Sequence, residues 1–275
     1  ALDGYHDIPG VEIAVFYPTG GTSEIQRLQM ATQEGANVAV YAVRGNFDDA
    51  QTGVKEIFAA CKDKDLHGAM LSSANSINIG RLAPQVVYYF RAYGDLVKSG
   101  RIRLGDVVDY TVPTGNFGDI LAGYFARQMG LPVGRLICAS NANDVLTEFL
   151  TTGRYDKRRP FYKTVSPSMD ILVSSNLERL LYLLSGDDKL IADLMKQLSE
   201  NGEYEVPADM LEKLHELFWA GFCDDEGAKT AIGKVWKDDH YLCDTHTAVA
   251  WDVAQQYKPV SYTHLRAHET RRHLV

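Results

Sequence analysis

One short run constrains this chain more than any other: Val112-Pro113-Thr114-Gly115-Asn116-Phe117-Gly118-Asp119. It joins a β-rich segment, residues 107–112, to an amphipathic segment, residues 120–129. Neither glycine carries a Cβ, so the backbone can turn sharply and approach a ligand closely. The N–H groups and the dipole of the following helix favour a phosphate there. The spacing fits neither the Walker motif nor the dinucleotide motif, and an ordinary strand-to-helix turn explains the run alone equally well.

Strand-like and helix-like segments alternate through the first half of the chain. The predicted strands are residues 11–17, 38–43, 68–72, 107–112 and 135–140, and the predicted helices are residues 23–32, 47–61, 79–97, 120–129 and 143–150. Ser23 and Gln26 form a capping box in the first helix, and Pro84 predicts a kink or a late start in the third. This order predicts an α/β fold with a mostly parallel sheet covered on both faces. Ligands of such sheets bind at the carboxyl ends of the strands, where the loops 72–78 and 114–119 fall.

The pattern becomes mainly helical from about residue 170. Helices are predicted at residues 176–184, 187–200, 207–219 and 224–235, and a last one ends at Tyr257. The acidic run Asp224-Asp225-Glu226 suits a helix N-terminus and is interpreted as dipole matching, not as a metal site.

The last residues of the chain differ from the rest. Residues 261–275 have no hydrophobic periodicity and resemble translated vector read-through. They contain His264, His268 and His273, but a flexible tail supplies no fixed ligand geometry, so no metal site is expected.

Composition limits the function classes. The formal net charge of −8 argues against a nucleic-acid partner or an acidic membrane surface, and no apolar run approaches the ~20 residues of a membrane helix. The cysteines are widely spaced without a C-x-x-C motif, which predicts reduced thiols in the cytoplasm. The chain begins at Ala1 without an initiator Met, so we expect that its true N-terminus is missing.

Two further clusters of polar residues open predicted helices. Ser72-Ser73-Ala74-Asn75-Ser76-Ile77-Asn78, followed by Arg81, suits a phosphate receptor, although an ordinary N-cap with a surface arginine explains it as well. Asp244-Thr245-His246-Thr247 reads as a helix cap. No G-x-S-x-G motif and no His/Cys/Glu set with zinc-ligand spacing accompanies either cluster.

Taken together, these motifs resemble the threonine synthase family, pyridoxal-phosphate enzymes of the tryptophan synthase β fold type. The stretches that carry the resemblance recur in family order over about residues 1 to 258: Phe16-Tyr17-Pro18, 40–46, 73–90, 113–119, 166–179 and 244–249. The sequences Ala74-Asn75-Ser76-Ile77-Asn78 and Ser168-Met169-Asp170-Ile171 are more similar to this family than to its dehydratase or cysteine-synthase relatives.

The resemblance implies conversion of O-phospho-L-homoserine and water to L-threonine and phosphate, with pyridoxal 5'-phosphate as cofactor. It implies that the cofactor's phosphate is held by Gly115, Asn116, Phe117, Gly118 and Asp119. The substrate's phosphate would be held by Asn75, Ser76 and Arg81, and Thr247 would contact the pyridine nitrogen. A neutral hydroxyl at that place, unlike a carboxylate, does not enforce a protonated ring.

The departures from the family pattern are equally informative. The family's Schiff-base lysine, in a Phe-Lys-Asp setting upstream of an S-G-D-T-G loop, has no counterpart, so no catalytic lysine is assigned, and position 245 is Thr where much of the family has Pro. We expect an interior fragment, inactive alone, with residues 1–103 in the small domain, 104–258 in the large cofactor-binding domain and 259–275 as a non-native tail. A threonine-synthase-like phospholyase and a non-catalytic phosphate-ligand binding protein remain alternatives, and the oligomeric state stays open.

Overall fold

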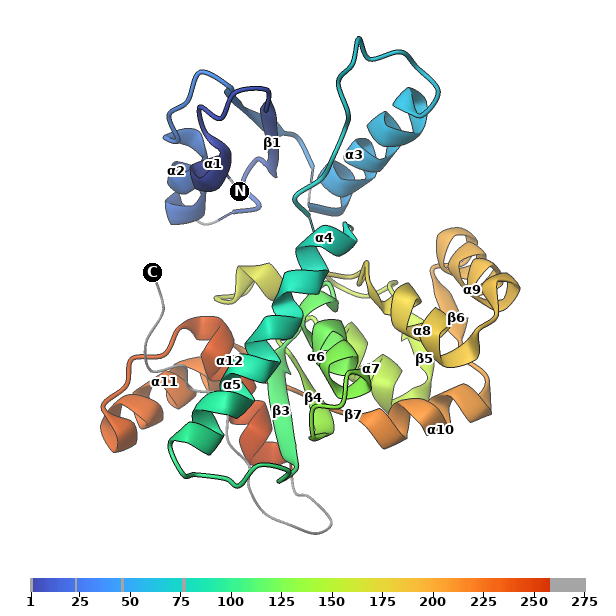
Figure 1. Ribbon diagram of the computed structural model, residues 1–275. Helices are drawn as coiled ribbons and strands as arrows, with labels where there is room; N and C mark the ends of the chain where they lie inside the picture. Colours follow the sequence, from blue (N-terminus) through green and yellow to red (C-terminus); the bar gives the residue numbers. More distant parts are fainter. Residues whose placement is uncertain (1, 23, 46, 76–77, 258–275) are drawn as a thin grey trace. The chain divides into compact units, whose positions relative to one another are not determined.

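The computed structural model describes residues 2–22, 24–45, 47–75 and 78–257 (Figure 1). The chain divides into two compact units, residues 1–74 and 75–275. The assignment of residues 1–103 and 104–258 to the small and large domains stays a prediction. The predicted non-native tail and its histidines lie outside the described residues.

The first unit is built on one pair of parallel strands. Its elements are α1 (Leu2–Tyr5), β1 (Ile13–Pro18), α2 (Glu24–Ala31), β2 (Val38–Val43) and α3 (Phe47–Cys61). The two strands pair in register from Ile13 with Val38 to Pro18 with Val43. The bounds of β2 and α3 agree with the prediction. The predicted capping box of α2 cannot be followed, because Ser23 and the Gln26 side chain lie outside what the structure describes.

The predicted strand at residues 68–72 is wrong. This segment has no regular secondary structure, and Gly68 has a left-handed φ of 84°. The described sheet of this unit consists of β1 and β2, and neither strand pairs with residues 68–72 through backbone hydrogen bonds. Met70 is 88% exposed. An apolar run becomes a strand only where a neighbour accepts its hydrogen bonds, and that neighbour is not visible in local sequence.

The second unit contains a parallel sheet with helices on both faces, which confirms the predicted α/β class. Its strands β3 (Val108–Pro113), β4 (Val133–Ser140) and β7 (Phe218–Phe222) are ordered β3-β4-β7 and run parallel. Side chains of β4 alternate between two cores: Leu136 and Cys138 join the larger one, and Ile137 and Ala139 join the other. Helices α6 (Gly118–Gln128) and α7 (Val145–Thr152) contribute to the larger core, whereas α11 (Asp225–Asp239) and α12 (Thr245–Gln256) contribute to the other (Figure 1).

The strand β7 corrects another prediction, because residues 207–219 do not form one helix. The helix α10 (Ala208–Leu217) ends where Phe218 begins the strand, which pairs with β4 from Leu136–Phe218 to Ser140–Phe222. Trp219 therefore lies in the sheet. Short apolar runs fit a buried strand and a buried helix turn equally well, and tertiary pairing decided between them.

Pro84 interrupts the helix predicted at residues 79–97. The segment forms α4 (Ile79–Leu82), a 3-10 turn η1 (Ala83–Gln85) and α5 (Val86–Lys98). Proline has no N–H to donate within a helix, and here it sits in the first turn of η1, where no such donor is needed. Leu82 is fully buried, so the short α4 is held by packing.

The remaining elements surround the sheet. They are β5 (Arg154–Asp156), the 3-10 turn η2 (Pro167–Met169), α8 (Leu177–Ser185), α9 (Asp188–Glu200) and β6 (Glu203–Glu205). The strands β5 and β6 pair antiparallel and were not predicted. Among the described helices, none combines the length and apolar character that a bilayer crossing requires.

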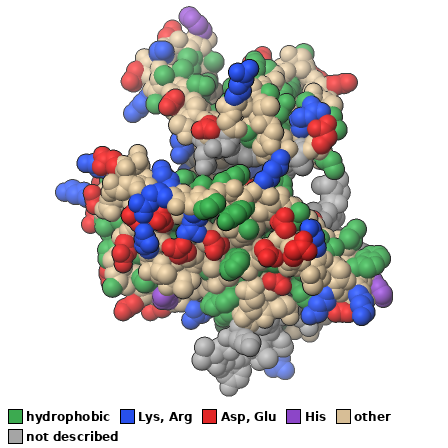
Figure 2. All heavy atoms as spheres, turned by 180° about the vertical axis from the view of Figure 1, so that it is seen from behind, with side chains coloured by type: hydrophobic (Ala, Val, Ile, Leu, Met, Phe, Trp, Pro, Cys, Tyr) green, Lys and Arg blue, Asp and Glu red, His purple; other side chains and the backbone are tan. Residues whose placement is uncertain are grey.

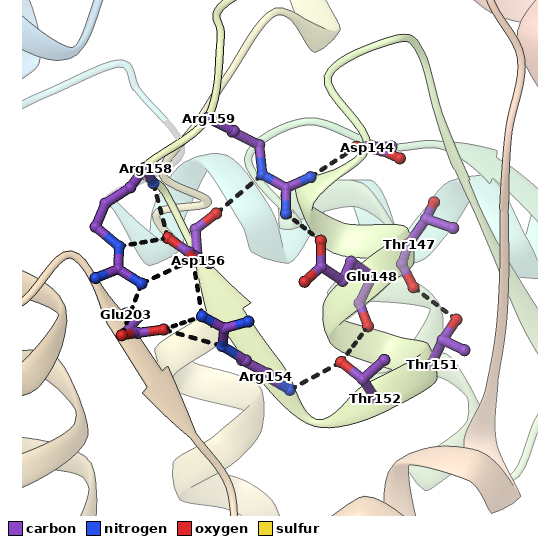
Figure 3. A network of polar contacts seen from close by, with 10 residues as sticks. All are labelled: Asp144, Thr147, Glu148, Thr151, Thr152, Arg154, Asp156, Arg158, Arg159 and Glu203. Carbon is purple, nitrogen blue, oxygen red and sulfur yellow. Dashed lines mark hydrogen bonds and ion pairs between the residues drawn. The ribbon is translucent and has the colours of Figure 1, made fainter.

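Ion pairs fasten the β5–β6 pair to its surroundings (Figure 3). Arg154 and Arg158 both pair with Asp156 and with Glu203, and Arg159 pairs with Asp144 and Glu148 of the α7 region. The Arg158 side chain lowers the pKa of Asp156 to about 2. Because all of these side chains remain at least partly exposed to solvent, each pair adds at most about 1 kcal/mol, so the network orients the chain that follows β5 more than it stabilises the fold. Acidic and basic side chains are also intermixed across the face in Figure 2.

Candidate phosphate-binding site at the end of the sheet

The predicted glycine loop joins β3 to α6 at the carboxyl end of the sheet. The Thr114 N–H donates to the Ala139 carbonyl of β4 at 2.8 Å, which fixes the start of the loop. The left-handed residue of the loop is Phe117, with φ 61° and ψ 9°, whereas neither Gly115 nor Gly118 has a positive φ. A left-handed conformation costs a non-glycine residue about 1–2 kcal/mol. Burial of the Phe117 ring, 1% exposed and 5.7 Å from the ring of Phe218, offsets this cost.

Gly115 is needed for close approach of another backbone segment. A Cβ on Gly115 would lie 2.8 Å from the carbonyl oxygen of Ser168. The carbonyl of Gly115 accepts the Ser174 hydroxyl at 2.8 Å, and the carbonyl of Asn116 accepts the side-chain amide of Asn176 at 2.8 Å. The carbonyls of the loop are therefore bound to the segment that leads into α8.

The backbone N–H groups of the same loop have no hydrogen-bond acceptor among the residues that the structure describes. From Gly115 to Ile120, none of the consecutive backbone N–H groups donates a hydrogen bond within the described part of the chain. Phe117, Gly118 and Ile120 are buried, so these donors lie where an unmade hydrogen bond is costly. At the positive end of the α6 dipole, this arrangement suits the oxygens of a phosphate. The geometry fits the group that the sequence predicts for Gly115 to Asp119.

Asp119 adds an unusual carboxyl to this loop. Its Oδ1 is buried and has no hydrogen-bond partner among the described residues, and the Tyr89 hydroxyl donates to its backbone carbonyl at 2.8 Å. Burial raises the pKa of the Asp119 carboxyl to about 6. The carboxyl can therefore hold a proton in slightly acidic solution, in which form it would repel a phosphate less.

This burial predicts a pH-dependent effect of Asp119→Asn on the ligand-free chain. The pKa of the Asp119 carboxyl is higher in the folded chain than in the unfolded chain. The charged carboxylate therefore costs the folded state nothing below about pH 4, and the free energy of unfolding falls as the pH rises to about 6 and above. Removing the charge should therefore raise the free energy of unfolding by about 3 kcal/mol at pH 7.5, and by little at pH 4. Urea unfolding at both pH values measures the difference. Asp188→Asn, at an exposed first-turn position of α9, is the control. An equal gain at both pH values would contradict the prediction.

A buried polar network holds the segment that faces Gly115, and no role was predicted from the sequence for its members. Asp170 Oδ1 accepts from the side-chain amides of Asn141 at 2.8 Å and of Asn143 at 3.1 Å, and from the Thr164 hydroxyl at 2.7 Å. Its Oδ2 accepts the Thr164 N–H at 3.0 Å. Asn141, Asn143 and Asp170 are all buried. One feature of the sequence could have indicated this network: Asn141 and Asn143 directly follow the strand β4, at the edge of a parallel sheet where ligands bind.

The N-terminus of α12 lies against the same segment. The Ser168 N–H donates to His246 Nε2 at 3.2 Å, and Asp244 caps the helix by accepting the N–H groups of His246 and Thr247. The helix cap that the sequence predicts is confirmed. Ser168, in the turn η2, thus lies against the glycine loop and against the N-terminus of α12, which carries Thr247. The two predicted parts of the site therefore lie on either side of this one short turn.

The helix α4, which carries Arg81 of the second predicted phosphate receptor, contacts α6, the helix that follows the glycine loop. Asn78 is the N-cap of α4, with its Oδ1 accepting the Gly80 N–H at 2.9 Å, and α4 contacts α6. Arg81 is exposed and makes no ion pair within the residues that the structure describes. Asn75 is exposed, and Ser76 lies outside the described residues. A role of Asn75, Ser76 and Arg81 in binding a phosphate stays a prediction.

Metal binding has no support in the described residues, where no group of His, Cys, Asp and Glu has a metal-site arrangement. The four cysteines Cys61, Cys138, Cys223 and Cys243 are free thiols. Burial raises the pKa of the Cys138 and Cys223 thiols to about 12, so neither is activated as a nucleophile.

Comparisons with known proteins place these features in context. No family model matches the chain. It is 43% identical over 260 residues to the Threonine synthase-like 1 protein of Macaca fascicularis, a match that covers 91% of this chain and 35% of that protein. It is 41% identical over 257 residues to the threonine synthase of Pseudomonas aeruginosa, covering 93% of this chain and 53% of that enzyme. The solved structure of PLP-bound threonine synthase from Brucella melitensis matches with a TM-score of 0.81 at 39% identity, over 94% of this chain and 54% of that one. The chain thus spans between about a third and about half of the length of these relatives.

Proposed function

Given that this chain belongs to the threonine synthase family and has the α/β fold of tryptophan synthase β-type pyridoxal-phosphate enzymes, we propose that the whole protein converts O-phospho-L-homoserine and water to L-threonine and phosphate. The observation that carries the proposal is the series of backbone N–H groups from Gly115 to Ile120, at the buried start of α6, that have no acceptor in the described part of the chain. Such a series is a receptor for the phosphate of the cofactor.

The cofactor would be held at both ends by this chain's own residues. The backbone of Gly115, Asn116, Phe117, Gly118 and Asp119 binds its phosphate, and Thr247 contacts its pyridine nitrogen. Pyridoxal phosphate, when bound, supplies the electron sink for deprotonation of the substrate's carbon atoms. Ser168, which lies against Gly115 and donates its N–H to His246, supports this proposal because it links the two segments that would hold the cofactor.

The substrate would be held by its phosphate group. Arg81 supplies a charge-assisted donor, and Asn75 and Ser76 supply neutral ones. Because α4 contacts α6, the substrate's phosphate would bind next to the cofactor's own. This arrangement directs the leaving group of the substrate toward Arg81.

Binding of the cofactor is the direct test on this chain. We expect ³¹P NMR of added pyridoxal phosphate to detect a bound phosphate with wild-type chain. We assign no catalytic lysine, so reduction with borohydride should leave the mass of the chain unchanged and the ligand removable by dialysis. Absence of a bound phosphate signal would contradict the role of the glycine loop. A reduced pyridoxyl group on one lysine would instead show that the lysine assignment was wrong.

Arg81→Ala tests the substrate site in the complete open reading frame. Loss of one charge-assisted contact costs about 1.5–3 kcal/mol, so KM for O-phospho-L-homoserine should rise about 10- to 150-fold while cofactor affinity stays unchanged. Steady-state kinetics and a pyridoxal-phosphate titration measure the two quantities. Arg101→Ala, at another exposed arginine, is the control. Equal loss of cofactor binding would contradict the placement of Arg81 at the substrate.

Product analysis separates the proposal from its alternatives. The proposed enzyme releases phosphate and L-threonine in equal amounts. A threonine-synthase-like phospholyase releases phosphate without threonine, and a phosphate-ligand binding protein releases neither. Measuring both products on one sample decides among these functions.

A further inference from the structure

The hydroxyl of Thr247 has its proton committed to a neighbouring carboxylate. Thr247 Oγ1 donates to Asp244 Oδ2 at 2.5 Å. A threonine hydroxyl has one proton to donate and two lone pairs that accept. With that proton directed to Asp244, Thr247 Oγ1 offers only lone pairs to a ligand.

Asp244 is fixed as an acceptor by its other contacts. Its Oδ1 accepts the N–H groups of His246 at 2.8 Å and of Thr247 at 3.1 Å, at the start of the α12 dipole. His246 Nδ1 lies 3.3 Å from the same oxygen, and His246 Nε2 accepts the Ser168 N–H at 3.2 Å. Since Nε2 accepts, the neutral ring carries its proton on Nδ1, which donates to Asp244. The His246 side chain and the Thr247 hydroxyl together hold the pKa of the Asp244 carboxyl well below its ordinary value.

We propose that Asp244 makes the Thr247 hydroxyl a hydrogen-bond acceptor toward the ring nitrogen of pyridoxal phosphate, so that this nitrogen binds in its protonated form. The nitrogen takes its proton from solvent, and no covalent bond is made or broken. The inference rests on the proposed function, which places Thr247 at the ring nitrogen. It goes beyond the sequence-based expectation, which was only that a neutral hydroxyl does not enforce a protonated ring. Asp244 is then a positioning residue, because it acts through Thr247.

Asp244→Asn tests the direction of the hydrogen bond. Asparagine is an equally good helix N-cap, and its Oδ1 keeps the backbone contacts. Its Nδ2 would donate to Thr247 Oγ1, which frees the hydroxyl proton to point at the ring nitrogen. The probe is pyridoxal phosphate labelled with ¹⁵N in the ring, titrated with pH while bound to wild type and to the variant. Relative to wild type, the acid dissociation constant of the ring nitrogen should rise at least about tenfold in Asp244→Asn.

A matched control separates this effect from simple capping. Asp224 caps α11 by accepting the Gly227 N–H at 2.8 Å, so Asp224→Asn changes a comparable cap and should leave the ring nitrogen titration unchanged. Equal ring nitrogen titrations in wild type and Asp244→Asn would overturn the proposal. If Asp244→Asn fails to fold, Thr247→Val removes the acceptor itself and should raise the same dissociation constant.

A ligand-free measurement tests the Asp244–Thr247 contact independently. In wild-type chain with ¹³C-labelled aspartate, the Asp244 carboxyl should titrate at a lower pH than in Thr247→Val, by about tenfold in acid dissociation constant. Identical Asp244 titrations would overturn the proposal even if the cofactor binds. Absence of a bound ³¹P signal would instead overturn the proposed function, and with it the contact to the ring nitrogen.

Discussion

Replacing Asp170 by alanine is expected to lower the free energy of unfolding of the second unit by about 3–5 kcal/mol. The carboxylate accepts the side-chain amides of Asn141 and Asn143 and two donors of Thr164. Alanine would leave these donors without the charged acceptor, and each buried donor left unpaired costs about 1–3 kcal/mol. Remaining contacts such as that of Asn141 with Ser166 recover part of this cost.

Urea unfolding of the wild-type chain, of Asp170→Ala and of one control variant measures this change in the free energy of unfolding. Asp193→Ala is the control, because Asp193 is exposed on α9 and accepts one helix-surface hydrogen bond from Gln197. We expect that control to change stability by no more than about 0.5 kcal/mol. A loss below 1 kcal/mol for Asp170→Ala would mean that the network contributes little to holding the turn at Ser168.

Gly115→Ala should weaken pyridoxal-phosphate binding about 5- to 150-fold. The new Cβ would lie 2.8 Å from the Ser168 carbonyl oxygen and 3.3 Å from the Met169 Cα. These are backbone atoms of a turn held by Asp170, so the glycine loop itself must move. Overpacking of this kind costs about 1–3 kcal/mol, and displacement of the loop would shift the backbone N–H groups that we propose bind the phosphate.

Titration with pyridoxal phosphate, followed by ³¹P NMR, measures the affinity. The matched control is Gly94→Ala in α5, where a Cβ would meet nothing within 4 Å. That substitution should leave binding unchanged and stabilise the helix by up to about 1 kcal/mol. Unchanged affinity in Gly115→Ala would show that the phosphate does not depend on this loop.

Local sequence patterns predicted the elements whose stability is local. The strand β2 and the helix α3 have the predicted bounds, and the helix cap at Asp244 forms as its sequence indicates. The loop from β3 to α6 also occurs where its glycines and flanking patterns put it. In each case, neighbours along the chain supply the periodicity, the side-chain acceptor or the turn.

Contacts between distant residues decided the elements that the sequence did not predict. Residues 68–72 have no neighbour among the described strands, whereas residues 218–222 pair with β4. Both runs are short and apolar, and a local propensity of less than about 1 kcal/mol per residue does not choose between a strand and another conformation. Strand pairing and burial of side chains stabilise a conformation by more than this local preference, and both depend on the whole fold.

The sequence by itself determined that this chain forms a parallel α/β sheet with a glycine loop at the carboxyl end of a strand. Only the tertiary structure decided how that loop is shaped. Burial of Phe117 against Phe218 puts the left-handed turn on a phenylalanine, and the Ser168 carbonyl makes Gly115 indispensable. The Asp170 network that fixes Ser168 joins residues from separate loops. Such contacts link positions far apart in the chain, so no local pattern records them, and only packing of the folded chain brings them together.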